Sequence, residues 1–241
     1  MPGVHAVALD APATDVDVWT CDLVRSAADV AAMEPVLAHA ELARAARFGR
    51  ADLRARYIVG RATLRAILGH ALGVGPADVV IVRGRRGRPL VPASALDFNV
   101  SHTGGRAIFG VTRGRRIGVD IEHRDRDVNV EGVGRKFMTP REQAMLDALA
   151  GDARRHALLR LWTCKEAMSK ATGDALSAPF RSLDVTLDPG LALAGGPALA
   201  LAGGPAPYQA EHWRLLAVDV PGGFLATVAL WHDPPRRDVP V

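Results

Sequence analysis

The sequence predicts a mixed α/β (α+β) protein made of two similar halves in a pseudo-twofold arrangement, with a functional site at their interface. Residues 36–72 and 140–173 carry apolar side chains at helical spacing, and short β-branched runs follow each of these regions. The chain has 241 residues and 49% hydrophobic content, which is ample for a buried core.

Each expected element has a local signal. The region 36–72 divides near Phe48-Gly49 into two helices, and Gly73 and Gly75-Pro76 end the second. Helices are expected again over 140–150 and 153–173. Expected strands lie at 79–82, 96–100, 107–112, 117–122, 183–187, 213–220 and 224–231.

The two halves are predicted from a weak internal similarity. Phe48, residues 56–61 and Arg65 follow one another as Phe137, residues 161–166 and Lys170 do. On this interpretation the halves are 1–110 and 111–241, and a ligand would bind between them because clefts between domains are common ligand sites. The alternative is that helical periodicity makes any two helices look alike.

A tandem repeat lies in the last third of the chain. LALAGGPA occurs at 191–198 and again, unchanged, at 199–206. Gly-Gly-Pro interrupts each copy, so we expect a strand or hairpin with an extended loop, remote from the chemistry.

The basic residues are mostly arginine. The net charge is +4, and of 30 lysines and arginines only Lys136, Lys165 and Lys170 are lysine. An ammonium group can give up its proton and a guanidinium practically cannot, so a retained lysine is a candidate acid; chance retention is the alternative.

Composition also bears on the class of protein. Cys21 and Cys164 are the two cysteines, without a CxxC motif, which favours neither a disulfide framework nor a thiolate zinc site. The sequence has neither a leader pattern at its N-terminus nor a run of about 18 apolar residues. We therefore expect a cytoplasmic enzyme that does not bind a membrane.

The first candidate motif is GVDIE, residues 118–122. On a strand Asp120 and Glu122 point to one face, and two adjacent carboxylates repel unless a positive charge lies between them. Oxygen-only ligands favour Mg²⁺. The alternative is a solvated strand end whose acids pair with Arg115, Arg116 or Arg124.

The second motif is WTCKEAMSK, residues 162–170. On a helix Trp162, Glu166 and Lys170 share one face, and the large aromatic suggests that this face is buried or lines a pocket. An ordinary Glu-to-Lys surface pair is the alternative. Cys164 lies off this face, and we interpret it as a packing residue.

The third motif is FNVSHTG, residues 98–104. A strand that ends in Ser-His and a glycine turn offers a hydroxyl, an imidazole and backbone amides where an anion could bind. Ser101 and His102 would point oppositely on a strand, so a nucleophile dyad is disfavoured, and a structural histidine remains the alternative.

In this order and spacing, GRP (87–89), FNVSHTG, GVDIE, Phe137 with Glu142, and WTCKEAMSK resemble the 4′-phosphopantetheinyl transferase superfamily. The resemblance spans roughly residues 40–190 and is greatest to the two-half, monomeric type associated with surfactin synthetase. It implies transfer of the phosphopantetheine arm from coenzyme A to a serine of an apo acyl or peptidyl carrier protein, with release of adenosine 3′,5′-bisphosphate.

The resemblance also implies roles for individual residues. The magnesium ligands would be Asp120, Glu122 and Glu166. Glu166, directly or through a metal-bound water, would take the serine proton, and Lys170 would stabilise or protonate the leaving bisphosphate, so the catalytic set is Asp120, Glu166 and Lys170. Coenzyme A would be held by Ser101 and His102 at its phosphates, by Lys170, and by Arg44, Arg47, Arg88 and Pro89 at its 3′-phosphate and adenine end.

Two positions depart from the family pattern. Arg88 replaces the usual lysine of GKP, and Glu41 stands where some relatives are basic, so it is open how Arg44, Arg47 and Arg88 share the 3′-phosphate.

The first half would contact the 3′-phosphate and adenine end, and the second would hold magnesium and dock the carrier protein, partly through a loop at 125–138. The sequence has no nucleic-acid-binding motif, so the basic turn 83–88 is expected to bind an acidic carrier protein rather than nucleic acid. A magnesium-dependent nucleotide phosphodiesterase is the alternative enzyme.

Overall fold

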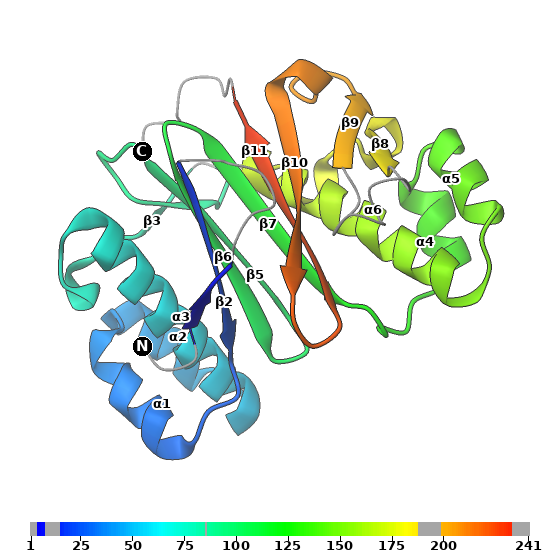
Figure 1. The fold of residues 1–241 in the computed structure, drawn as a ribbon. Coiled ribbons are helices and arrows are strands. Elements are labelled where there is room, and N and C mark those ends of the chain that lie inside the picture. The colour runs from blue at the N-terminus through cyan, green and yellow to red at the C-terminus, as the bar shows by residue number, and fades with distance from the viewer. Residues whose placement is uncertain (1–3, 8–14, 85, 188–198, 233–241) are drawn as a thin grey trace.

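The computed structural model describes residues 4–7, 15–84, 86–187 and 199–232. Two antiparallel sheets lie side by side in the middle of this part of the chain (Figure 1). The helices of the first half, blue to cyan, lie on one side of the strands, and those of the second half, green to yellow, lie on the other. None of the helices in these ranges is long and apolar enough to cross a membrane.

The first half contains a four-stranded sheet. Its strands, in spatial order, are β1 (Val4–Ala6), β2 (Val16–Asp22), β6 (Arg106–Arg113) and β5 (Leu96–Thr103). Its helices are α1 (Ala27–Met33), α2 (His39–Ala46) and α3 (Ala51–Leu72). A core of buried residues from α3 and the sheet joins these layers, among them Leu68, Phe98 and Phe109.

The second half repeats this plan. Its sheet has the order β10 (Trp213–Val220), β11 (Phe224–Trp231) and β7 (Arg116–His123). Its helices are α4 (Val130–Phe137), α5 (Pro140–Asp147) and α6 (Gly151–Thr172). Apart from β1, each half therefore runs from one strand, β2 or β7, through three helices and a small hairpin to two further strands.

The two small hairpins connect the long helix of each half to its last two strands. They are formed by β3 (Val82–Arg83) with β4 (Pro89–Leu90), and by β8 (Asp184–Leu187) with β9 (Leu199–Gly203). Short 3-10 helices complete the described part: η1 (Glu34–Val36), η2 (Pro76–Asp78), η3 (Ala175–Ser177), η4 (Phe180–Ser182) and η6 (Ala210–His212).

The internal similarity is real, but its register differs from the expected one. Helices α3 and α6 both have 22 residues and both end at a left-handed glycine, Gly73 and Gly173. This alignment pairs Arg65 with Lys165 rather than with Lys170. Both side chains are buried and bind a glutamate at the start of a shorter helix, which explains why these two cations correspond.

Some expected boundaries were wrong for identifiable reasons. A strand was expected at 79–82, but β3 begins only at Val82. Residues 79–81 instead belong to the connection between α3 and β3, in which Arg65 Nη1 donates to the carbonyl oxygen of Val79. The loop expected at 125–138 contains α4, which begins after the N-cap Asn129. The second copy of the tandem repeat contains β9, as expected for a strand; the first copy lies outside the described residues.

The two halves meet where β5 lies against β7. These strands belong to different sheets, so side chains of β5 bind the backbone of β7 instead. Asp97 Oδ2 accepts from the amide of Ile117 and Asn99 Oδ1 accepts from the amide of Val119, both at 2.9 Å. In the part of the chain that the structure describes, these two amides are thereby satisfied by side chains and not by another strand.

Candidate active site

Strand β7 and helix α6 approach each other closely at Gly118. A Cβ atom at this position would lie 1.8 Å from the carbonyl oxygen of Ala167 and 2.7 Å from the amide nitrogen of Ala171. Only glycine allows such an approach of two backbones. The close packing brings Asp120, two residues further along β7, within reach of Lys170 on α6.

Asp120 is the centre of a buried polar network. Its Oδ1 accepts hydrogen bonds from Lys170 Nζ at 2.6 Å and from Ser101 Oγ at 2.8 Å, and Lys170 Nζ also donates to Ser101 Oγ at 2.9 Å. Asp120 is only 5% exposed. Its second oxygen, Oδ2, is buried and has no hydrogen-bond partner among the described residues. A buried carboxylate oxygen without a partner is costly, which is typical of a site that binds a cation or a substrate group.

The stripe predicted on α6 is confirmed. Between Leu161 and Thr172 the helix is buried except at Trp162, Glu166 and Lys170, which are half-buried. The indole of Trp162 packs edge-on against the ring of Phe137, with 5.0 Å between centroids. One face of α6 therefore offers a carboxylate and an ammonium group next to a fixed aromatic ring.

Glu122 completes the carboxylate pair on β7. Its Oε1 accepts from Arg126 Nη1, and Thr103 Oγ1 donates to its Oε2 at 3.3 Å. Burial raises the pKa of Glu122, and the charge of Asp120 adds to the rise. Arg126, Thr103 and Lys170 oppose it.

Glu166 responds to the same charges. Burial raises the pKa of this carboxyl group, with further increases from Asp120 and Glu122, while Lys170 opposes the rise. The three carboxylates thus influence one another electrostatically. A group with a raised pKa accepts a proton more readily at neutral pH, which suits a general base.

The structure does not gather these carboxylates into a metal-binding cluster. Within the described ranges, no group of three or more histidine, cysteine, aspartate or glutamate residues is placed to hold a metal ion. Lys170 and Arg126 bind Asp120 and Glu122 directly. The donor set nevertheless fits magnesium, because it consists of carboxylate oxygens and leaves Asp120 Oδ2 buried without a partner. The magnesium site stays a prediction.

The retained lysines have different environments. Lys165 is fully buried, and its Nζ donates to Glu142 Oε2 at 2.6 Å and to the carbonyl oxygens of Phe137 and Phe180. Lys136 Nζ lies 5.0 Å from the centre of the Phe137 ring. Of the three lysines, only Lys170 contacts a carboxylate of β7 in the described structure. Lys165 instead has a structural role, because it neutralises the buried Glu142.

A basic pocket of about 950 Å³ opens in the first half, between α2, α3 and the β3–β4 hairpin. Its walls include Arg44, Arg47, Arg61, Arg65 and Arg83 together with Phe48, Tyr57 and Pro89. The guanidinium of Arg44 lies over the ring of Tyr57, 5.7 Å from its centre. Arginine and aromatic side chains in one pocket suit a ligand with a phosphate and a planar base.

Glu41 forms ion pairs with two of the arginines of this pocket. Its Oε2 accepts from Arg65 Nε at 2.6 Å, and its Oε1 accepts from Arg61 Nε at 2.7 Å. Burial by itself would raise the pKa of Glu41, but the charge of Arg61 and the hydrogen bonds from both arginines lower it. Arg61 and Arg65 are therefore engaged within the protein. Arg44 and Arg47 form no ion pair with any described residue.

Three residues assigned to the phosphates lie in unlike positions. Ser101 is buried and bound to Asp120 and Lys170, whereas His102 is exposed. Arg88 differs most from expectation: its side chain is only 8% exposed and forms a bidentate ion pair with Asp97. Because internal contacts occupy this guanidinium, we do not retain it among the phosphate-binding residues.

Two family models together match most of the chain. Residues 116–229 match the 4′-phosphopantetheinyl transferase superfamily, and residues 25–111 match the N-terminal part of 4′-phosphopantetheinyl transferases. The 4′-phosphopantetheinyl transferase HetI of Nostoc sp. is 35% identical over 179 residues, which are 73% of this chain and 75% of that protein. The chain belongs to the 4′-phosphopantetheinyl transferase superfamily.

Two further proteins are similar to shorter parts of the chain. A 4′-phosphopantetheinyl transferase of Bacillus subtilis is 30% identical over 142 residues, 58% of this chain and 62% of that protein. A crystal structure of a holo-(acyl-carrier-protein) synthase from Bacillus anthracis in complex with CoA (3′,5′-ADP) has a TM-score of 0.37 and 19% identity, and covers 49% of this chain and 96% of that chain.

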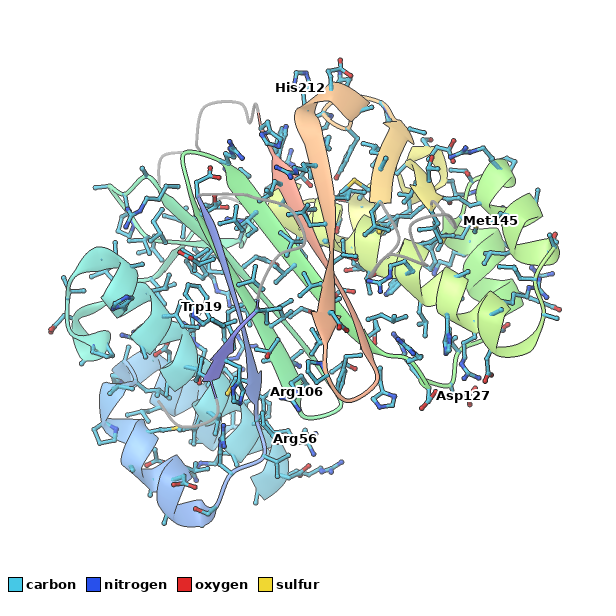
Figure 2. The ribbon with its side chains drawn as sticks, viewed as in Figure 1. Trp19, Arg56, Arg106, Asp127, Met145 and His212 are labelled. Atoms are coloured by element: carbon cyan, nitrogen blue, oxygen red, sulfur yellow. The ribbon has the colours of Figure 1, made fainter. Side chains whose placement is uncertain are left out.

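Sequence reasoning on this superfamily member missed several residues of the site. Thr103 and Arg126 bind Glu122, and Gly118 permits the contact of β7 with α6. Thr103 had a usable signal, because it follows Ser101 at alternate spacing on the same strand. Arg126 had none, since it lies beyond the end of β7. Figure 2 labels the residue that follows it, Asp127.

Proposed function

We propose that this chain transfers the 4′-phosphopantetheine arm of coenzyme A to a serine of an apo acyl or peptidyl carrier protein and releases adenosine 3′,5′-bisphosphate. One observation carries the assignment of the site: Asp120, Ser101 and Lys170 form a buried network at the junction of the halves, with Asp120 Oδ2 unpaired. In a member of this superfamily, such a network is a suitable place for the diphosphate of coenzyme A.

The basic pocket supports a division of the substrate between the halves. Arg44 and Arg47 are suited to bind the 3′-phosphate, and the Tyr57 ring offers a surface for the adenine. Pro89 lies on the wall of the same pocket. The first half would thus bind the 3′-phosphate and adenine end of coenzyme A, as expected, but without a contact from Arg88.

Magnesium is part of the proposal. Asp120, Glu122 and Glu166 would hold it, since burial and mutual repulsion raise the pKa values of Glu122 and Glu166 and a cation would relieve both effects. When bound, the metal would neutralise charge on the diphosphate. Binding would compete with the present ion pairs of Lys170 and Arg126.

The protein residues would carry the proton transfers. Glu166 accepts the proton of the carrier serine as the serine oxygen forms its bond to the β-phosphorus of the diphosphate, the one that bears the pantetheine. The bond from that phosphorus to the bridging oxygen breaks, and the bisphosphate leaves with that oxygen. Lys170 donates a hydrogen bond or a proton to this leaving oxygen, and Ser101 Oγ keeps the Lys170 ammonium next to Asp120.

The carrier protein would dock on the second half. Arg135 and Lys136 are exposed at the end of α4, close in sequence to the carboxylate strand, and suit an acidic partner. We propose that the enzyme acts as a cytoplasmic monomer, and that neither nucleic acid nor membrane is its partner.

Mixing the enzyme with magnesium, coenzyme A and a panel of apo carrier proteins tests this function. Intact-mass spectrometry should show one added phosphopantetheine on at least one carrier, together with an equal amount of adenosine 3′,5′-bisphosphate. Release of bisphosphate at the same rate without any carrier would instead support a nucleotide phosphodiesterase. The accepting carriers would also identify the fatty-acid, polyketide or nonribosomal-peptide class that the enzyme serves.

A further inference from the structure

Arg88 lies where four segments of the molecule meet. Its Nε donates to the carbonyl oxygen of Lys170 at 3.0 Å, and its Nη1 and Nη2 each donate to one oxygen of Asp97 at 2.7 Å. Nη2 also lies 2.7 Å from the carbonyl oxygen of Ile117 and 3.2 Å from that of Phe98. The side chain of Arg88, the residue before β4, thus connects β5 of the first half to β7 and α6 of the second.

The contact with Lys170 satisfies a specific need of α6. The last carbonyl groups of a helix have no partner within the helix. Here the amides of Gly173 and Asp174 both turn back to the carbonyl oxygen of Ser169, which leaves the carbonyl of Lys170 for another donor. Arg88 is that donor among the described residues, so it holds the backbone of the residue whose ammonium group binds Asp120.

Asp97 extends the same arrangement to the carboxylate strand. Its Oδ2 accepts both from Arg88 and from the amide of Ile117, three residues before Asp120 on β7. Asp97 and Arg88 are almost fully buried, with side chains 4% and 8% exposed. A buried bidentate pair of this kind has a well-defined geometry, which it can transmit to the groups that it binds.

We propose that Arg88 is a positioning residue, which acts on phosphoryl transfer through Lys170 and does not bind coenzyme A itself. Its guanidinium holds the C-terminal end of α6 against the start of β7, so that Lys170 Nζ lies at Asp120 and Ser101. The proposal rests on the proposed function of this site. It differs from the contact with the 3′-phosphate or adenine end that the family resemblance implied for Arg88.

Steady-state kinetics of Arg88→Gln and Arg88→Lys test the proposal, with coenzyme A varied at a saturating concentration of carrier protein. We expect Arg88→Gln to lower kcat roughly tenfold or more with less than a twofold change in the KM of coenzyme A. Arg88→Lys keeps a charge beside Asp97 but lacks the Nε–H group, and it should restore part of kcat. A rise in KM with unchanged kcat would overturn the proposal and return Arg88 to the ligand site.

A double-mutant cycle with Lys170→Ala separates positioning from a general structural role. If Arg88 acts through Lys170, Arg88→Gln should cause little further loss of kcat when Lys170 is already alanine. Equal losses in both backgrounds would overturn the proposal. Because Arg88→Gln leaves Asp97 buried without its cation, Arg88→Lys is carried through the same cycle, so that the test does not depend on one variant folding.

Two controls make the result specific. Arg50→Gln removes an exposed ion pair with Asp52 in the first half and should leave kcat and KM unchanged. 3′-Dephospho-coenzyme A should be disfavoured equally by the parent enzyme and by Arg88→Lys; loss of this discrimination in the variant would contradict the proposal. If the parent enzyme modifies no carrier, the proposed function fails, whereas an active parent with a KM effect at Arg88 refutes only this inference.

Discussion

Asp120 illustrates how single residues make this site. One of its oxygens binds both Lys170 and Ser101, and the other is buried without a partner in the described structure. The satisfied oxygen fixes the orientation of the carboxylate, and the unsatisfied one retains the capacity to bind a ligand. Glu166 has a different character, because burial and two neighbouring carboxylates favour its protonated form.

Substitution of the carboxylates tests this view. Asp120→Ala and Glu166→Ala should each lower transfer by roughly a thousandfold or more, because each removes a predicted metal ligand and Glu166 is also the proposed base. Intact-mass measurement of carrier modification gives the rate, and circular dichroism checks that the variants fold. Near-normal transfer by either folded variant would refute the site assignment.

Lys170→Ala should separate catalysis from binding. We expect kcat to fall by roughly a hundredfold, because the leaving bisphosphate loses its proton donor. The dissociation constant of coenzyme A, measured by calorimetry, should change far less, since the pocket arginines remain. Weakened binding with an unchanged rate would make Lys170 a binding residue only.

At the scale of elements, the contact between β7 and α6 depends on Gly118. A methyl group there would meet the backbone of α6 at Ala167, and neither element can move without disturbing the buried core. Gly118→Ala should therefore lower the free energy of unfolding by about 1–3 kcal/mol or more, measured by urea denaturation, and reduce transfer strongly.

Gly134→Ala is the matched control for this substitution. Gly134 lies within α4, and a Cβ atom there would meet nothing within 4 Å. Alanine also has the higher helix propensity, so this variant should be as stable as the parent or slightly more so. A stable, active Gly118→Ala variant would mean that β7 and α6 can separate without loss of the site.

The two buried glutamates that bind cations on the long helices also belong to this scale. Glu41 binds Arg61 and Arg65 in the first half, and Glu142 binds Lys165 in the second. Each glutamate also accepts the amide of its helix's N-terminal cap, from Ala38 or Thr139. The same local device is thus used twice, with arginine in one half and lysine in the other.

The pair at Glu41 predicts a pH dependence of stability. Because its folded-state pKa is lowered, ionised Glu41 stabilises the fold above its unfolded pKa, and this contribution is lost as the pH falls through the folded value. Glu41→Gln should cost about 2 kcal/mol at pH 7. The difference from the parent, measured by urea denaturation, should shrink below about pH 4. A difference that stays constant down to pH 3 would contradict the assignment.

At the scale of the whole molecule, the two halves are similar in plan but have different tasks. The first half contains the basic pocket with Arg44 and Arg47, and the second contributes the carboxylates and Lys170. Side chains of β5 join the halves by binding backbone amides of β7. A substrate long enough to reach both regions would require this relative placement.

Substitutions in the pocket test this division of tasks. Arg44→Gln and Arg47→Gln should raise the KM of coenzyme A by roughly tenfold, with little change in KM for 3′-dephospho-coenzyme A, because each removes a partner of the 3′-phosphate. Arg56→Gln, on α3 but outside the pocket wall, is the control and should behave like the parent (Figure 2). Equal effects on both substrates would exclude a 3′-phosphate contact.

Local signals in the sequence sufficed for the mixed α/β class, for most helices and strands and for the face of α6 that bears Glu166 and Lys170. Side-chain alternation on β7 and helical spacing on α6 depend on neighbouring residues only, so they can be read without the tertiary structure. The family could be recognised for the same reason, because its motifs are short and ordered along the chain. The surfactin-synthetase-associated type stays a prediction.

Only the tertiary structure decided which charged residues neutralise one another. Arg88 and Lys165 look like candidates for binding or chemistry in the sequence, yet both are buried against acids from distant segments, Asp97 and Glu142. Lys170 is the lysine that reaches Asp120. The physical reason is that a charge in the interior needs a partner at close range, and the partner is supplied by folding rather than by position along the chain.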